Sequence, residues 1–182
     1  MKIVLLTLAV LLLAVPVLAQ QGGSIGIFAN MYGSQCDYLD MSGLFDIYVV
    51  HMFTPGSTGS QFRVDVSPGV TMTLLQTNYM TGIYIGDPFT GIQIAYGSCL
   101  SSPIVLIDFL YWNHGTSEPC SYFQIAADPA GVSPGIYSVD CGIPGNIVPA
   151  TGGRLIVNPQ AGCYCNVPAE DTSWGQIKSL YQ

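Results

Sequence analysis

Alternating apolar and polar residues predict several strands that have one face in a core and the other in solvent. Phe62, Val64 and Val66 alternate with polar residues, so their side chains share one face of an extended segment. Residues 92–96 and 137–141 show the same period of two. Glycine, proline and serine cluster around these segments, which is typical of short strands separated by turns.

Two longer runs are apolar at nearly every position and predict a different kind of strand. Residues 45–53 and 104–112 are interrupted only by Asp46, His51 and Asp108. Strands that are apolar on both faces are usually covered on both sides. We therefore expect these two runs to be central strands, buried on both faces.

Shorter segments complete a set of about nine strands, and no convincing 3.6-residue helical period occurs before residue 166. We expect residues 56–60 to form a turn between strands. Short strands at this spacing favour two packed antiparallel sheets over a fold with helical crossovers. The sequence thus predicts an all-β, antiparallel, Ig-like sandwich over residues 22–165. The other strands are expected at residues 24–28, 72–76, 122–126 and 154–157.

The first 19 residues have the pattern of a secretory signal peptide. Lys2 precedes an apolar run, and small or medium residues lead up to Ala19, so cleavage is expected between Ala19 and Gln20. The alternative is a retained membrane anchor, but the apolar run over residues 3–19 is shorter than the roughly 20 residues that a spanning helix needs. We expect a secreted protein without a membrane span, located in the periplasm, outside the cell or at the cell surface.

The last 17 residues, 166–182, predict a short helical tail. A helix could start near Asp171 or Thr172, with its apolar residues on one face. A helix of two turns is marginal alone in water and must dock on something. We expect it to pack on its own domain, and the alternative is a docking or sorting tag that a partner recognises. The apolar face would consist of Trp174, Ile177, Leu180 and Tyr181.

The even number of cysteines agrees with export and predicts three disulfides. Cys163 and Cys165 are too close to bridge each other without strain, so we expect them to pair with different partners. Cys99 and Cys120 flank the run at 104–112. If the chain between them leaves and returns to the same end of the domain, these two cysteines would form a disulfide. A zinc site is disfavoured because the close pair is Cys-x-Cys rather than CxxC. The six residues are Cys36, Cys99, Cys120, Cys141, Cys163 and Cys165.

Three segments carry a resemblance that spans nearly the whole chain after the signal peptide. They are residues 23–36, residues 44–65, which include Tyr48-Val49-Val50-His51, and residues 152–165. Together they resemble a group of small secreted bacterial proteins of unknown function. The resemblance implies export, disulfides and a β-sandwich, and it implies no catalytic activity.

The charge composition excludes two classes of protein. Charged residues make up 8% of the 182 residues, and the formal net charge is −7. Disordered chains are highly charged and poor in apolar residues, so that class is excluded. An acidic chain also has no electrostatic attraction for a phosphate backbone, so we expect no nucleic-acid partner.

Carboxylates supply the candidates for an acid pair or a calcium site. Asp46 and Asp108 lie on apolar strands, and two carboxylates about 5 to 9 Å apart could serve a glycoside hydrolase. The simpler interpretation places them at a sheet edge or strand end. Asp37, Asp40 or Asp87 could contribute to a calcium site, but no DxDxDG loop is present. We therefore predict no enzyme, no metal site and no cofactor.

Aromatic residues supply the candidates for ligand binding. Tyr111, Trp112 and His114 lie together in sequence, and Tyr79 and Tyr84 lie in nearby loops or strands. Tyrosine and tryptophan rings in loops can stack on the faces of sugars. These residues are the candidate site of a carbohydrate-binding module.

Three functions are consistent with the sequence, and we rank them in order of preference. The first is a secreted, non-catalytic interaction or structural module that binds a protein partner or assembles with itself. Low charge leaves few residues to prevent pairing between edge strands, which favours self-association. The second is a carbohydrate-binding module, and the third is a secreted hydrolase that uses Asp46 and Asp108.

Overall fold

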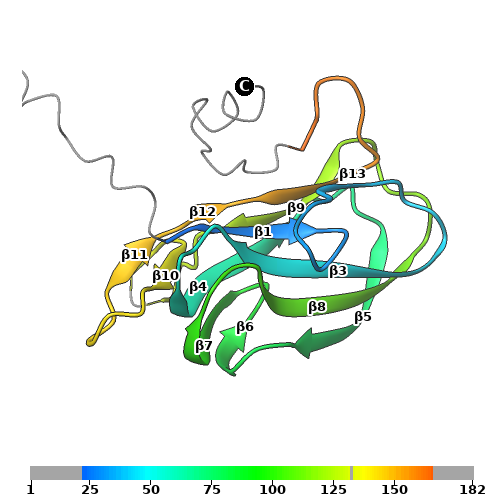
Figure 1. Cartoon of the computed structure of the whole chain (residues 1–182). Coiled ribbons are helices and arrows are strands. Elements are labelled where there is room, and N and C mark those ends of the chain that lie inside the picture. The colour runs from blue at the N-terminus through cyan, green and yellow to red at the C-terminus, as the bar shows by residue number, and fades with distance from the viewer. Residues whose placement is uncertain (1–21, 132, 166–182) are drawn as a thin grey trace, which may run out of the picture.

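The computed structural model describes residues 22–131 and 133–165, which form two facing β-sheets (Figure 1). The predicted all-β sandwich is confirmed, but the expected number of about nine strands is too low. The predicted signal peptide at 1–19 and the tail at 166–182 lie outside the described residues. The described part contains thirteen strands: β1 Ser24–Phe28, β2 Asp37–Tyr38, β3 Gly43–Met52, β4 Ser57–Val66, β5 Met72–Tyr79, β6 Ile83–Asp87, β7 Gly91–Leu100, β8 Ile104–Asn113, β9 Ser121–Ala126, β10 Tyr137–Val139, β11 Ile147–Pro149, β12 Thr151–Gly152 and β13 Arg154–Val157.

The two sheets are built almost entirely from antiparallel pairs. The first has the order β12-β1-β3-β8-β5, and the second follows β11-β10-β4-β9-β13-β2, with β7 pairing β4 and β6 pairing β7. Two short pairings, β1 with β12 and β2 with β13, are parallel, so the expectation of a wholly antiparallel fold is wrong at these points. The first of them joins the two sheets along one side of the sandwich.

The core lies between the sheets and follows the period of two in β4 and β7. In β10 the predicted alternation is reversed, because Ser138 is buried and Tyr137 and Val139 lie on the outer face. Phe62 and Val64 are buried in the core, as the alternation predicts. Val66 is the last residue of β4 and is 40% exposed, so its predicted burial is wrong. Phe109 on β8 and Phe123 on β9 are also buried and close the core from opposite sheets.

The two apolar runs form β3 and β8, which both have neighbours on two sides, so their predicted central position is confirmed. The face toward the other sheet is buried, whereas the outer face is fully buried at Val50, which packs with Phe28 and Cys36. On the outer face Asp46, Tyr48 and Asp108 are partly exposed, so the expectation of two covered faces is wrong. The apolar residues on this face reflect partial cover rather than a second layer.

Residues 56–60 do not form the expected turn, because β4 already begins at Ser57. The sequence looks like a loop because it is rich in serine and glycine. Inside the fold, Ser57 Oγ donates to the Gly59 carbonyl (2.9 Å) and lies 2.9 Å from Ser138 Oγ. These bonds satisfy a buried hydroxyl and allow a polar segment to form an interior strand.

Three disulfides are present, and one predicted pairing is wrong. Cys99 pairs with Cys141 rather than Cys120. The strand β8 lies between Cys99 and Cys120 and runs once along the sandwich, so it carries them to opposite ends. Cys163 and Cys165 have different partners, as predicted. The other bridges are Cys120–Cys163 and Cys36–Cys165.

Within the described residues, no helix is long and apolar enough to cross a lipid bilayer.

Candidate functional site

Five neighbouring strands of the second sheet form a shallow groove on their outer face. The strands lie in the order β6-β7-β4-β10-β11. Their register aligns five residues in one row across the sheet: Ile83, Ala95, Gly59, Val139 and Ile147. Large aliphatic side chains stand at both ends of this row, and the two smallest residues stand at its centre. This arrangement creates a groove with apolar walls and a low floor.

A second row runs beside the first and adds polarity to the floor. It contains Ile85, Gln93, Gln61 and Tyr137 in register. The Gln61 amide Nε2 donates to the Ser133 carbonyl at 2.7 Å. Two amides therefore line the floor between an isoleucine on one wall and a tyrosine ring on the other.

The walls of the groove are exposed although they are apolar. Ile83 is 75% exposed, Ile85 is 73% exposed and Ile147 is 54% exposed, and the hollow between the walls has a volume of about 370 Å³. At the floor, a Cβ on Gly59 would lie 2.9 Å from the Ile94 carbonyl oxygen. Glycine therefore keeps the centre of the groove low and lets β4 and β7 pair closely.

The groove is uncharged, and the charged residues lie beyond its end. None of the residues that line it is acidic or basic. Further along the same outer face, Arg63 Nε donates to Asp65 Oδ1 at 2.7 Å. On the neighbouring strands, the Arg154 guanidinium lies 5.4 Å from the centre of the Tyr122 ring. The surface thus has an apolar centre with a polar border of arginine and tyrosine.

A buried polar contact lies behind the groove, between the two sheets. His51 Nε2 lies 2.7 Å from the Gly22 carbonyl, and His51 Nδ1 lies 3.0 Å from the Tyr96 hydroxyl. A carbonyl can only accept, so Nε2 carries the proton and Nδ1 accepts from Tyr96. Burial lowers the pKa of His51, and the bond to Gly22 partly opposes this shift. The neutral ring therefore joins β3 to β7 and to the first described residue.

The two candidate catalytic carboxylates lie close together but outside the groove. Their strands pair, as the hydrolase hypothesis requires: Tyr48 is opposite Asp108, and Asp46 is two residues away on the same face. Asn78 Nδ2 donates to Asp108 Oδ2 at 3.2 Å. Burial raises the pKa of Asp46, and the charge of Asp108 raises it further. Both residues lie within strands, so their expected placement at a strand end or sheet edge is wrong.

The candidate calcium ligands do not converge. Asp40 Oδ2 accepts from the Ser117 amide (2.8 Å), and Asp87 Oδ1 accepts from the Phe89 amide (2.8 Å) at the turn after β6. Asp37 belongs to β2 on another part of the sheet. Among residues 22–131 and 133–165, no three histidine, cysteine, aspartate or glutamate residues form a group suited to a metal ion.

The structure separates the aromatic residues that the sequence suggests for sugar binding. Tyr111 is 4% exposed and packs edge to face against Phe123, so its ring is inside the core. Trp112 is 43% exposed on the opposite face of the same strand. His114 Nε2 lies 2.9 Å from the Thr73 hydroxyl. The three proposed ligand-binding residues therefore do not form one site.

Tyr79 and Tyr84 stack on each other instead of forming a platform for a ligand. Their ring centres are 3.5 Å apart, and the ring planes differ by 13°. Their strands β5 and β6 belong to different sheets, so the stack connects the two sheets at their margin.

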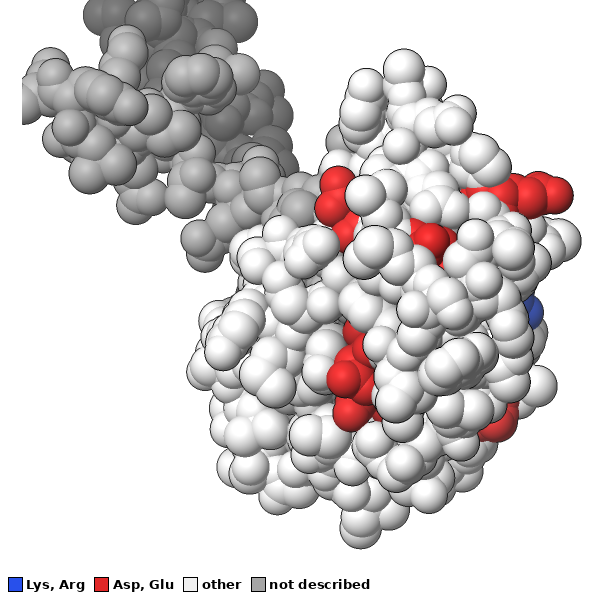
Figure 2. Space-filling view, turned by 90° about the vertical axis from the view of Figure 1, so that its right-hand side faces the viewer, with Lys and Arg blue, Asp and Glu red and all other residues white. Residues whose placement is uncertain are grey.

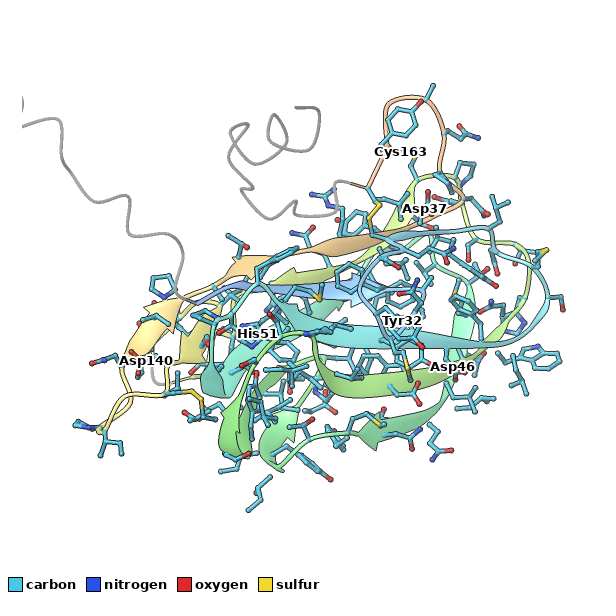
Figure 3. The ribbon with its side chains drawn as sticks, viewed as in Figure 1. Tyr32, Asp37, Asp46, His51, Asp140 and Cys163 are labelled. Carbon is cyan, nitrogen blue, oxygen red and sulfur yellow. A yellow bond between two sulfur atoms is a disulfide. The ribbon has the colours of Figure 1, made fainter. Side chains whose placement is uncertain are left out.

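A second hollow lies beside the Cys99–Cys141 disulfide, at the end of β10. It has a volume of about 340 Å³ and includes Asp140 and Gly142. Asp140 accepts hydrogen bonds from the amides of Asn146 and Gly142, which lower its pKa. Figure 3 labels Asp140 at the far end of the sandwich from Asp46, so these carboxylates do not act on one ligand.

Charge is sparse on the surface as well as in the groove. In Figure 2, a few acidic groups are scattered over a face that is otherwise uncharged, and one basic group is visible at its margin. No single-sign patch on this face suggests a highly charged ligand.

Sequence reasoning missed the groove because its residues come from five separate segments. The sequence signal for the β6 wall is the run Ile83-Tyr84-Ile85 between two glycines, in which two aliphatic residues alternate with a tyrosine as in a strand. Gly82 and Gly86 have positive φ angles of 69° and 97°, and this glycine content gives the segment the composition of a turn.

Comparisons with known proteins show a fold but no family. No protein-family model matches the chain, and no curated protein matches it. Among solved structures, a cohesin module from a family 33 glycoside hydrolase of Clostridium perfringens ATCC13124 is similar with a TM-score of 0.50 and 8% sequence identity. The match covers 76% of this chain and 98% of that one.

Two further solved structures are similar at lower scores. One is a type I cohesin–dockerin complex, Coh-OlpA-Doc918, from Clostridium thermocellum, with a TM-score of 0.47 and 12% identity, covering 74% of this chain and 97% of that chain. The other is the sixth cohesin of scaffoldin B from Acetivibrio cellulolyticus in complex with a Cel5 dockerin, with a TM-score of 0.43 and 11% identity, covering 76% of this chain and 99% of that chain. The described residues thus share the β-sandwich fold of the Clostridium perfringens cohesin module.

Proposed function

We propose that this chain is a secreted, non-catalytic module that binds another protein through the groove on β6, β7, β4, β10 and β11. The observation that carries the proposal is a row of exposed isoleucines around an uncharged hollow. Exposed apolar patches with a polar border are typical of protein interaction sites.

The shape of the groove suits a protruding apolar side chain of a partner. Gly59 and Ala95 keep the floor low, and Ile83 and Ile85 on one wall face Val139 and Ile147 on the other. A side chain inserted between them would lose its water on both sides, which is the environment of interface hot spots. The amide of Gln93 on the floor would satisfy a polar group of the partner backbone.

The fold and the disulfides agree with this role. The Clostridium perfringens neighbour is described as a module of a larger hydrolase, which is a precedent for this sandwich as an accessory unit. The six cysteines of the described chain are all paired, and such pairing is typical of proteins in oxidising compartments. Together with the predicted signal peptide, this supports a position outside the cytoplasm.

A carbohydrate-binding role is the second candidate, and one observation favours it. Trp112 is exposed on the outer face of the first sheet, with Leu44 and Thr73 beside it in register. An exposed indole can stack on a sugar ring. The same face holds Asp46 and Asp108, but neither hollow described above contains a carboxylate pair, which argues against a hydrolase.

Site-specific photo-crosslinking tests the proposal. A diazirine amino acid of similar size replaces Ile85 in the groove wall, and a control replaces Leu39, an exposed leucine beside β2. Both variants are expressed in the cells that secrete the chain and irradiated. We expect a discrete adduct with a protein other than this chain from position 85 and none from position 39. The absence of a discrete adduct at position 85, or the same adduct from both positions, would contradict the proposal.

A glycan array with the same secreted protein separates the two candidates. The protein-binding proposal expects no sugar to bind. Binding that is lost in Trp112→Ala and retained in Ala95→Arg would instead support the carbohydrate-binding role.

A further inference from the structure

We infer that β6 is a self-pairing edge, through which two copies of this chain join antiparallel into one continuous sheet. This inference goes beyond the proposed partner binding, because the second copy occupies the strand edge and leaves the groove open. It rests on the topology, on the sequence of β6 and on the position of its isoleucines.

The sandwich has one closed side and one open side. On the closed side, the parallel pairing of β1 with β12 connects the first sheet to residues that continue into the second. On the open side, β5 ends the first sheet and β6 ends the branch of the second, and Figure 1 shows both at the lower margin. The N–H and C=O groups along the outer side of each of these strands have no strand partner among the described residues.

Of these two edge strands, only β6 lacks a bulge, proline or early charge that would hinder pairing with another chain. Its register with β7 is unbroken from Ile83 to Asp87, it contains no proline, and it carries no charge before Asp87. The β5 edge has a register shift between Leu74 and Gln76, and such bulges interrupt pairing with another chain. The ends β2 and β12 have two residues each, and β11 ends in Pro149, which has no N–H to donate to another strand.

An antiparallel pairing of β6 with its own copy is complementary in side chains as well as in backbone. With Tyr84 at the two-fold axis, Ile83 of one copy stands opposite Ile85 of the other, on the groove face. Residues that are directly opposite in antiparallel strands share a face and have Cβ atoms about 4.5–5.5 Å apart. Four exposed isoleucines thereby contact one another and lose part of their exposure to water.

The negative net charge of the chain favours contact between two copies at this uncharged edge over contact at charged surfaces. Copies with a net charge of −7 repel each other, so a contact is favoured where the surface is uncharged. In the antiparallel arrangement, the Asp87 residues of the two copies lie at opposite ends of the paired strands. Each copy adds Ile83 and Ile85 to a wall that both grooves share, so the pair presents two binding grooves on one continuous face.

Sedimentation equilibrium of the full secreted chain over a concentration series tests the inference. We expect a monomer–dimer equilibrium and a dissociation constant that rises at least tenfold in Ile85→Lys. The matched control is Ile143→Lys, since Ile143 is fully exposed in the loop after β10 and should leave the constant unchanged.

Hydrogen exchange assigns the contact to the strand. Amides of β6 should exchange more slowly as the concentration rises, whereas amides of β5 should not change. A monomer at every concentration, a dimer that Ile85→Lys does not weaken, or concentration-dependent protection at β5 instead of β6 would each overturn the inference. None of these outcomes affects a hetero-protein adduct at position 85, so failure here is distinguishable from failure of the proposed function.

Discussion

At the scale of single residues, the sequence predicts the strand position of His51 but not its hydrogen-bond partners. The apolar run around it correctly predicts a place in a central strand. Its partners, Gly22 and Tyr96, lie 29 and 45 residues away in the chain, so only the fold brings them to the two ring nitrogens. Figure 3 shows His51 within the sandwich. A buried, neutral histidine with both nitrogens bonded makes stability depend on pH.

We predict that the free energy of unfolding falls as the pH decreases below about 6.5, the pKa of histidine in an unfolded chain. The folded state lowers the pKa of His51, so the unfolded state takes up a proton that the folded state excludes. The contribution is fully present above pH 6.5, and it is lost by at most about 1.4 kcal/mol per pH unit until the folded pKa is reached.

Urea unfolding of wild type and His51→Gln between pH 5 and 8 measures this effect. The variant should lose the histidine-dependent part of the slope, and His114→Gln, at an exposed histidine, should keep it. Equal slopes in all three proteins would show that His51 does not control the pH dependence.

At the scale of elements, the strands with a clear period of two are the ones that sequence reasoning locates correctly. The segments around Phe62 and at 92–96 are examples, because half-buried strands have one apolar face. The start of β4 is rich in serine and glycine, and β6 contains Gly86 and follows Gly82, so the composition of both segments favours turns. These segments are strands because β7 pairs with both, and such pairing cannot be derived from local composition.

The Cys99–Cys141 disulfide allows a test at this scale. It joins the end of β7 to the residues after β10 and closes a loop with a sequence separation of 42. Loss of this cross-link increases the entropy of the unfolded chain, and a loop of this length corresponds to about 4 kcal/mol. Cys99→Ser/Cys141→Ser should therefore lose about 4 kcal/mol in urea unfolding.

The Cys120–Cys163 disulfide is a matched control, because its separation of 43 is nearly the same. Its double serine variant should be destabilised by a similar amount. A loss below about 1 kcal/mol in either variant would contradict the expected effect of loop closure.

The core provides another prediction for the elements. Phe109 on β8 is buried and contacts the rings of Phe89 and Tyr111, with centre distances of 5.5 and 6.2 Å. Phe109→Ala would leave a cavity between the sheets and should lower the free energy of unfolding by about 3–5 kcal/mol. Trp112→Ala, on the exposed face of the same strand, should lose less than half as much in the same chemical denaturation.

At the scale of the whole molecule, the sequence predicts a sandwich with three disulfides but not its binding surface. Composition and period identify the layers, and the even cysteine count predicts the number of disulfides but not their pairing. The groove depends on which residues of five strands stand in register, and Ile83 and Ile147 are 64 positions apart in the sequence. Register is a property of the assembled sheet, so this surface becomes visible only in three dimensions.

The central claim is that the groove binds a protein, and one comparison tests it most directly. The photo-crosslinking residue at position 85 is combined with Ala95→Arg, which places a charge on the groove floor without changing the wall. The account predicts that the yield of the protein adduct falls at least tenfold, while Leu39→Arg leaves it unchanged. An adduct that forms equally well with arginine at position 95 would contradict the claim that a partner enters the groove.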